Sequence, residues 1–147
     1  MEDIVLFDGE FLVSTKKEKL DMNIISDFLS NLSYWAKGRN IETIKRSIEN
    51  SVVFGMYDKN NRQIGFARVI SDYSVFAYLL DVFIVEEYQH TGLGQKLIEV
   101  VMDHPSLKQV KRVVLNTKDA HTFYQKFGFK KTENSDTYME FSRIQNK

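Results

Sequence analysis

The sequence predicts an α/β (mixed α+β) fold, with a central mixed, mostly antiparallel sheet that contains one parallel strand pair. Two observations predict it. Val75–Val85 is a long, almost continuously apolar run (VFAYLLDVFIV), a pattern typical of a central strand covered on both faces. Apolar residues at helical spacing follow this run and predict a helix. A helix in this place provides the crossover connection that parallel strands need. The expected order is β-α-α-β-β-β-α-β-α-β-β, with about four helices beside the sheet.

Two helices are predicted before the long strand, each from a capping residue and the apolar spacing after it. Asp21 is expected to cap the first helix, which Gly38 ends, and Asn40 is expected to cap the second. Their apolar faces are Ile24, Ile25, Phe28, Leu29 and Leu32 in the first helix, and Ile41, Ile44 and Ile48 in the second.

Two further helices are predicted after the long strand. The first must end near His104-Pro105, because proline cannot continue a helix. Asp119 can cap the second, Ala120–Phe127, and Gly128 suits the position just beyond a helix. The apolar face of the first of these helices is Leu93, Leu97, Ile98 and Val101.

The remaining strands are predicted from short apolar runs bounded by turn residues. Asp58–Asn61 and Asp72–Ser74 have the composition of tight turns that join neighbouring strands. Besides Val75–Val85, the expected strands are Phe11–Val13, Ser51–Tyr57, Gln63–Ser71, Val110–Leu115, Phe129–Thr132 and Thr137–Phe141.

Composition narrows the class of protein. A chain of 147 residues is expected to form one domain, 1–147, on the usual prior of roughly 100–200 residues. The 20 basic and 20 acidic side chains balance, which argues against a nucleic-acid partner bound by phosphate neutralisation. Cysteine is absent, which excludes a cysteinyl intermediate.

Location and metal content are predicted from what the sequence lacks. Met1–Ile4 holds acids where a signal peptide holds bases, and no run approaches about 18 uninterrupted apolar residues. A cytoplasmic protein with no membrane partner is therefore expected. His90, His104 and His121 are scattered along the chain, so no metal site is expected.

The sharpest motif is Gln89–Gly94 (QHTGLG), between the long strand and the next helix. Glycines allow a tight turn and close approach of a ligand, and the unpaired N–H groups of a helix start attract phosphate. The motif is neither a dinucleotide fingerprint nor a P-loop, because Gln95 follows its second glycine. The alternative is a turn that only lets the helix begin.

Two segments together resemble a known family. Asp81–Gly94 (DVFIVEEYQHTGLG) resembles the acyl-CoA binding motif of the GNAT superfamily of N-acetyltransferases, and Ala120–Phe129 (AHTFYQKFGF) is similar to its second signature. Both stand in the family's order and at its separation. The resemblance implies the family fold, in which the two parallel strands splay apart, and acetyl-CoA as co-substrate.

The resemblance also implies where acetyl-CoA binds. The cleft would lie between the strands that end at Val85 and at Asn116. Asn116 would touch the pantetheine amide, or would be only a polar strand end. His90 stands where many members have arginine, which removes a fixed positive charge. The main chain of Phe83, Ile84 and Val85 would hold the pantetheine, and Gln89, His90, Thr91, Gly92, Leu93 and Gly94 would hold the pyrophosphate.

Two residues are candidates for catalysis. Tyr124 matches the family's tyrosine near the thioester sulfur and would protonate the departing thiolate; a phenol with a pKa of about 10 suits that leaving group. The alternative is a core tyrosine. Asp81 is the only charged residue in its apolar strand and is the candidate general base or amine-binding group. It could instead pair with Arg68 or cap a bulge, and water could take the proton.

The acceptor side is implied only coarsely. Trp35 could wall a pocket or pack on the sheet, and Arg68 could bind a substrate carboxylate or pair with Asp81. His121 could line the pocket or be solvated. The candidate acceptor residues are Trp35, Arg68, Tyr73, Asp81 and His121.

The function expected from the resemblance is transfer of an acetyl group from acetyl-CoA to a primary amine, by direct attack in a ternary complex. The acceptor would be a small molecule, and a homodimer is common in the family. The alternative is a catalytically inactive CoA-binding regulatory or protein-interaction module on the same fold.

Overall fold

The computed structural model describes residues 3–6, 9–133 and 135–144. These residues belong to two compact units, Met1–Thr117 and Lys118–Lys147. That the whole chain acts as one domain stays a prediction.

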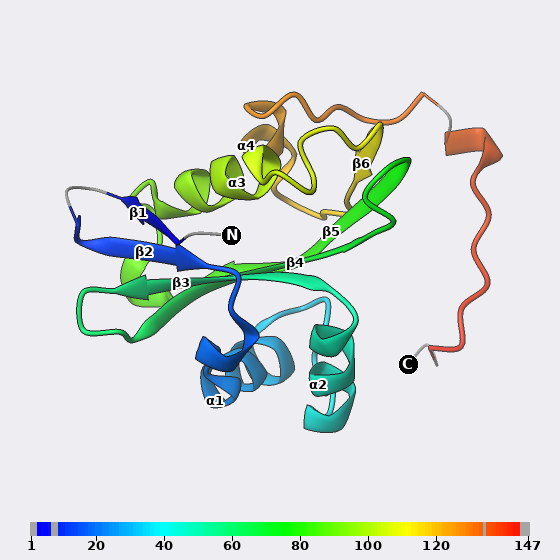
Figure 1. The fold of residues 1–147 in the computed structure, drawn as a ribbon. Coiled ribbons are helices and arrows are strands. Elements are labelled where there is room, and N and C mark those ends of the chain that lie inside the picture. Colours follow the sequence, from blue (N-terminus) through cyan, green and yellow to red (C-terminus); the bar gives the residue numbers. More distant parts are fainter. Residues whose placement is uncertain (1–2, 7–8, 134, 145–147) are drawn as a thin grey trace. The chain divides into compact units, whose positions relative to one another are not determined.

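A six-stranded sheet in the order β1 to β6 is the centre of the first unit, as far as the structure describes it (Figure 1). The neighbours from β1 to β5 are antiparallel. β1 was not predicted, because a three-residue run carries little periodicity. The other five strands confirm the predictions in this unit. The strands are β1 (Ile4–Leu6), β2 (Phe11–Ser14), β3 (Val52–Asp58), β4 (Gln63–Ser71), β5 (Phe76–Ile84) and β6 (Arg112–Val114).

The one parallel pair of this sheet, within the described residues, joins β5 to β6. Its register runs from Phe76 opposite Arg112 to Tyr78 opposite Val114. β6 ends there, whereas β5 continues to Ile84. The second half of β5 therefore has an edge that β6 does not cover. This mixed, mostly antiparallel sheet, with one parallel pair in which β6 ends before β5, confirms the predicted fold class.

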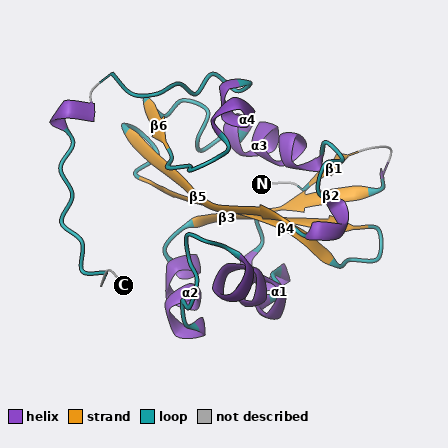
Figure 2. Cartoon of the chain, turned by 180° about the vertical axis from the view of Figure 1, so that it is seen from behind, coloured by secondary structure: helices purple, strands orange, loops and turns teal. Residues whose placement is uncertain are grey.

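Helices cover both faces of the sheet (Figures 1 and 2). On one side lie α1 (Met22–Asp27) and α2 (Ile41–Glu49), and on the other lies α3 (Leu93–Asp103). The predicted caps of α1 and α2 are confirmed: the Asp21 side chain accepts from the N–H groups of Asn23 and Ile24, and the Asn40 side chain accepts from that of Thr43. α3 ends at Asp103, just before His104-Pro105, as predicted.

The end of the first helix was predicted wrongly. After α1 the chain forms one π-helical turn, η3 (Phe28–Leu32), and Ser33 is already extended. The Ser33 hydroxyl donates to the carbonyl of Leu29 at 2.6 Å and accepts from the N–H of Ala36 at 3.1 Å, which turns the chain away from the helix. Gly38, with a φ of 81°, lies in the connection to α2 and does not end the helix.

Two apolar layers sandwich the sheet. On the α1 and α2 side, the buried cluster contains Ile25, Leu29, Ala36, Ile44, Ile48, Val53, Phe66 and Phe83. Ile41, expected on the same face, is 38% exposed because it stands in the first turn of α2. On the other side, the predicted α3 residues Leu93, Leu97, Ile98 and Val101 are all buried.

The second unit contains α4 (His121–Gln125) and the 3-10 turn η5 (Ser135–Thr137). Its described residues contain no strand, so the predictions of Phe129–Thr132 and Thr137–Phe141 are wrong. Met139 and Phe141 are 97% and 80% exposed, and a hairpin that buries neither face is not stable by itself. Ala120, not Asp119, is the N-cap of α4, and no side chain caps it.

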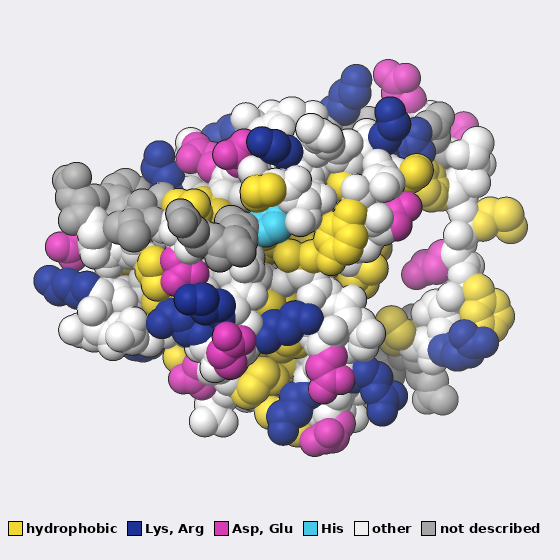
Figure 3. Space-filling model, in the orientation of Figure 1, with side chains coloured by type: hydrophobic (Ala, Val, Ile, Leu, Met, Phe, Trp, Pro, Cys, Tyr) yellow, Lys and Arg dark blue, Asp and Glu magenta, His cyan; other side chains and the backbone are white. Residues whose placement is uncertain are grey.

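Charged side chains of both signs are interspersed over α2 and the first strands on the face drawn in Figure 3. This pattern agrees with the balanced composition. Within the described residues, no helix is both long and apolar enough to cross a membrane.

Candidate active site

Asp81 lies at a bulge in β5, on the α1 and α2 side of the sheet. Phe66 is paired with Phe83 but Arg68 is paired with Leu80, so β5 holds one residue more than β4 over this stretch. Asp81 lies within the bulge and has a φ of 56°. This is a left-handed conformation, which aspartate tolerates better than most residues. Bulges of this kind re-aim side chains and are common beside active sites.

Asp81 is buried, with 3% of its surface exposed, and both of its carboxylate oxygens are hydrogen-bonded. Oδ1 accepts from Nε1 of Trp35 at 3.0 Å. Oδ2 accepts from Nη1 of Arg39 at 2.8 Å and from Nε of Arg68 at 2.9 Å. The structure thus brings together three predicted residues, Trp35, Arg68 and Asp81, and shows the pairing with Arg68 that the sequence left open.

Arg39 is the member of this cluster that the sequence reasoning missed. Its signal was indirect: a lone aspartate in an apolar strand must be compensated when buried, and Arg39 lies in the loop that also carries Trp35. Trp35 itself remains 41% exposed, and its ring contacts those of Tyr34 and Phe28 at centroid distances of 5.2 Å and 6.4 Å. It therefore both bonds the buried carboxylate and presents an aromatic surface.

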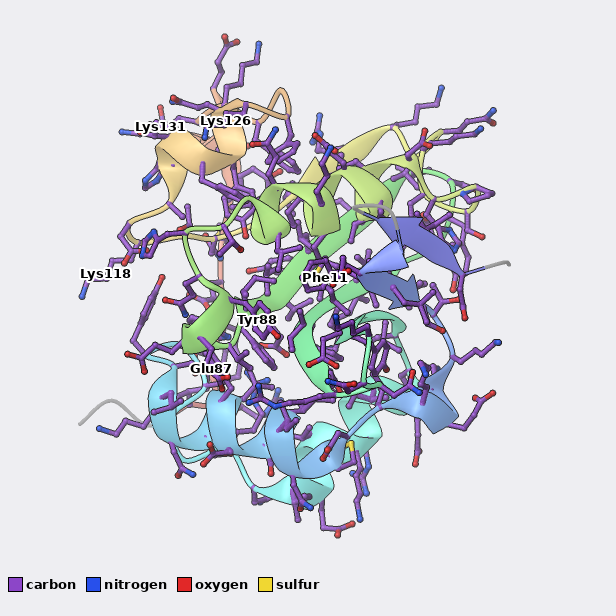
Figure 4. All side chains as sticks on the ribbon, turned by 90° about the vertical axis from the view of Figure 1, so that its left-hand side faces the viewer. Phe11, Glu87, Tyr88, Lys118, Lys126 and Lys131 are labelled. Atoms are coloured by element: carbon purple, nitrogen blue, oxygen red, sulfur yellow. The ribbon has the colours of Figure 1, made fainter. Side chains whose placement is uncertain are left out.

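The glycine loop follows β5 directly. A 3-10 turn, η4 (Glu86–Tyr88), leads into it, and Figure 4 shows Glu87 and Tyr88 on that turn. Arg62 binds Glu87 through two hydrogen bonds of 2.7 Å and 3.0 Å, and the Tyr88 ring meets that of Phe11 edge-on at 5.8 Å. These contacts fasten the start of the loop to the β3–β4 turn and to β2.

Gly92 is the N-cap of α3 and has a φ of 86°, while His90 also has a positive φ of 63°. A β-carbon on Gly92 would meet no atom within 4 Å, so glycine serves the backbone conformation there rather than a tight space. No side chain caps α3 among the described residues. The first N–H groups of this eleven-residue helix are therefore available to an anion.

Side chains of the glycine loop form hydrogen bonds to main-chain carbonyls just before the loop. Gln89 Nε2 donates to the carbonyl of Ile84 at 2.9 Å, and the Thr91 hydroxyl donates to the carbonyl of Tyr88. Leu93 is buried and anchors the helix. The predicted loop residues thus build a backbone-lined turn, and their roles toward pyrophosphate stay predictions.

The open edge of β5 offers main-chain groups next to this loop. The Val85 N–H donates to the carbonyl of Ile64 at 2.8 Å, on the β4 side. The backbone N–H and C=O groups of successive residues point to opposite edges of a strand. Those of Phe83 therefore also point toward β4, and those of Ile84 point away from it. The Ile84 carbonyl is occupied by Gln89, which leaves the Ile84 N–H facing the uncovered edge. Of the three residues predicted to hold the pantetheine through their main chain, only Ile84 has an N–H group that points to this edge. The contact itself stays a prediction.

Asn116 lies just beyond β6, and its Nδ2 donates to the Tyr78 hydroxyl at 2.6 Å. Tyr78 was not predicted as a site residue, because in the sequence it is one more residue of the long apolar strand.

Tyr73, a predicted acceptor residue, lies apart from the Asp81 cluster in the β4–β5 turn, with a φ of 64° and 54% exposure.

Tyr124 and His121 both lie on α4, in the second unit. The Tyr124 ring contacts Phe123 at 5.0 Å and Phe129 at 5.8 Å, and its N–H donates to the carbonyl of Ala120 at 3.1 Å. His121 is exposed. Among the described residues, no group of three His, Asp or Glu side chains is arranged to hold a metal ion.

Comparison with known proteins assigns a family to this arrangement. Residues 49–131 match the family profile described as "Acetyltransferase (GNAT) domain". A Xanthomonas campestris pv. campestris protein of known crystal structure, described as belonging to the GNAT family, is 39% identical, with a TM-score of 0.87 over 90% of this chain and 92% of that one.

Two other comparisons are informative. A Gibberella zeae protein named as a candidate acetyltransferase is 28% identical, and the match covers 83% of this chain and 80% of that protein. A Mycobacterium tuberculosis protein solved in complex with CoA shares the fold at 14% identity, with a TM-score of 0.68 over 82% of this chain and 72% of that one.

Proposed function

This chain belongs to the GNAT family of acetyltransferases, and from that premise we propose that it transfers an acetyl group from acetyl-CoA to a primary amine of a small molecule. The family membership supports acetyl transfer. The acceptor class and the direct mechanism are the parts that this proposal adds.

The observation that carries the proposal is the junction of β5 with α3. There the uncapped first turn of α3 follows an edge of β5 that β6 does not cover. The N–H groups and dipole of a helix start favour a phosphate. The outward N–H of Ile84 can hydrogen-bond an extended chain as a neighbouring strand would. A pyrophosphate joined to an amide-containing arm, as in CoA, satisfies both features.

The proposed reaction is a single displacement. The neutral amine nitrogen attacks the thioester carbonyl carbon, the carbon–sulfur bond breaks, and the thiolate of CoA takes a proton from Tyr124. The absence of cysteine favours this direct route over an acyl group carried on a thiol of the protein. Tyr124 recovers its proton from solvent after the products leave.

Asp81 has a positioning role in this proposal. Three donors already occupy its carboxylate, two of them guanidinium groups. It therefore orders Trp35, Arg39 and Arg68 on the acceptor face, and the proton lost by the amine goes to water. The variant Asp81→Asn separates this role from the alternative role of Asp81 as the general base.

Calorimetric titration with acetyl-CoA tests the binding site through two matched variants, Gly92→Asp and Gly92→Asn. Both side chains tolerate the left-handed conformation of Gly92, so the two variants differ mainly in charge. We expect Gly92→Asp to bind acetyl-CoA at least about tenfold more weakly than Gly92→Asn, because a carboxylate at this position repels the pyrophosphate. Circular dichroism checks that both variants fold.

Equal affinities for the two variants would remove the loop from the binding site. A thiol-release assay with a panel of primary amines then tests transfer. Binding of acetyl-CoA without release of thiol on any amine would favour the inactive CoA-binding module instead.

A further inference from the structure

A groove of about 430 Å³ lies between α2 and β4, in the range of small-molecule sites. It opens on the sheet face that α1 and α2 cover. Phe66, Arg68 and Ile70 are two residues apart along β4 and therefore lie on the same face, and Phe66 belongs to the core on that side. All but one of the side chains around it carry polar groups. The groove is lined by Thr43, Arg46, Ser47, Asn50, Ser51, Arg68 and Ile70.

Arg68 is the buried wall of this groove. Its side chain is only 7% exposed. Its Nε donates to Asp81, and its Nη1 donates to the Ser51 hydroxyl at 3.0 Å. A guanidinium has five N–H donors, and Nη2 has no hydrogen-bond partner in the part of the chain that the structure describes. An acceptor placed in the groove would satisfy a donor that the fold leaves unused.

The charges around the groove do not cancel. Arg46, exposed on α2, forms no ion pair within the described residues, although Glu42 and Glu49 lie on the same helix. Asp81 is shared between Arg39 and Arg68. The residues that line the groove include two arginines, Arg46 and Arg68, and no acidic residue, which leaves an excess of positive charge. Arginine is the residue best suited to hold carboxylate or phosphate oxygens in pairs.

We propose that this groove binds an anionic group, a carboxylate or a phosphate, of the amine acceptor. That the anion belongs to the acceptor rests on the function proposed above. The geometry supports the link, because Arg68 is bonded to Asp81, three residues before Ile84 on β5. At the rise of an extended strand this separation is on the order of 10 Å. A small molecule can span it, with its anion at Arg46 and Arg68 and its amine toward the acetyl donor.

The test compares amines long enough to span this distance that differ only in an anionic group: 6-aminohexanol with 6-aminohexyl phosphate, and heptylamine with 7-aminoheptanoate. Arg46→Gln is the informative variant because Arg46 is exposed and has no structural bond to lose. Lys45→Gln is its control, an exposed cation on the same helix outside the groove. We expect wild type and Lys45→Gln to prefer an anionic amine about tenfold in kcat/KM, and Arg46→Gln to lose most of that preference without slowing on the neutral partner.

A binding measurement keeps this inference separate from the transferase proposal. Trp35 is the single tryptophan and bonds the carboxylate that also holds Arg68, so its fluorescence reports on the cluster. Inorganic phosphate and acetate are titrated separately against chloride at equal ionic strength. We expect saturable binding of at least one anion by wild type and Lys45→Gln, weakened about fivefold or more in Arg46→Gln.

Each outcome decides one proposal. Absence of saturable anion binding, anion binding that ignores Arg46, or equal use of neutral and anionic amines would each overturn the groove assignment. Arg46-dependent anion binding by a protein that acetylates no amine would leave the groove assignment standing and overturn the proposed function. The stronger of the two anions distinguishes a phosphate from a carboxylate on the acceptor.

Discussion

Arg68 and Asp81 are hydrogen-bonded across the β4–β5 pair although a bulge in β5 takes them out of direct register. Arg68 stands opposite Leu80 in the register, yet its Nε lies 2.9 Å from Oδ2 of Asp81. Regular antiparallel pairing continued from Phe66 and Phe83 would set Arg68 opposite Asp81, and the extra residue sets it opposite Leu80 instead. The bulged part of β5 thus holds a buried carboxylate that bonds Trp35 and Arg39 as well, on the face where an acceptor is proposed to bind.

Asp81→Asn is expected to destabilise the fold strongly. The amide keeps the size of the side chain but leaves Arg39 and Arg68 without their counter-charge, and breaking a buried pair in this way costs about 3–5 kcal/mol. Glu87→Gln is the matched control, because its pair with Arg62 is on the surface and is worth about 1 kcal/mol or less. Urea unfolding of both variants measures the difference in free energy of unfolding.

The opposite pattern would revise the role of Asp81. If Asp81→Asn unfolds like Glu87→Gln but loses most of its kcat, the carboxylate acts on the proton of the amine rather than on the fold. If both stability and kcat are unchanged, the cluster has neither role.

The sequence predicted those elements whose signal is local. Asp21 and Asn40 cap helices because their side chains reach N–H groups two or three residues ahead, and Pro105 stops α3 by its own chemistry. The failures have non-local causes. Gly38 does not end its helix because a π-turn and Ser33 have already turned the chain. The last two predicted strands did not form because alternation alone cannot supply a partner strand.

The candidate site divides in the same way. The glycine loop was visible because φ above zero at Gly92 requires a residue type that the sequence shows. Arg39, Arg46 and Tyr78 were not visible, since each acquires its importance from a residue far along the chain. The bulge at Asp81 was left open by the sequence, because a single charged residue in an apolar strand signals burial but does not reveal its partner.

Tyr57→Phe is expected to stabilise the protein at neutral pH. Tyr57 is fully buried and folds over Gly55, where an added β-carbon would lie 2.3 Å from the phenol oxygen. That oxygen has no hydrogen-bond partner among the described residues, and such an orphan costs about 1–3 kcal/mol. Removing it is expected to raise the free energy of unfolding by about 1 kcal/mol, while Lys19 can still lie over the ring. Tyr138→Phe, at an exposed site, is the control.

The same variant is expected to change stability in alkali. Burial first, and then the charges of Asp3 and Asp21, raise the pKa of the Tyr57 phenol above its usual value. The folded state therefore keeps this proton after the unfolded chain begins to lose it, so stability falls as the pH rises above about 10. Urea unfolding between about pH 9 and 11 is expected to show a shallower fall for Tyr57→Phe. A slope equal to that of wild type would contradict the burial of an ionisable phenol here.

Tyr124→Phe is expected to lower kcat for acetyl transfer by about 100-fold or more, the usual contribution of a general acid. Its ring contacts with Phe123 and Phe129 do not need the hydroxyl, so α4 is expected to keep its packing and the affinity for acetyl-CoA to stay close to that of wild type. Tyr138→Phe removes a phenol from an exposed site of the same unit and is expected to leave kcat unchanged.

The pH profile distinguishes a proton donor from a packing residue at Tyr124. If Tyr124 donates the proton, kcat of the wild type falls on the alkaline side as the phenol ionises, and Tyr124→Phe loses that limb. A better leaving group separates the two roles further: an acyl donor whose thiol is more acidic needs less help from an acid, so the deficit of Tyr124→Phe should shrink with it. An equal deficit for both donors, with the alkaline limb retained, would show that Tyr124 only packs against Phe123 and Phe129.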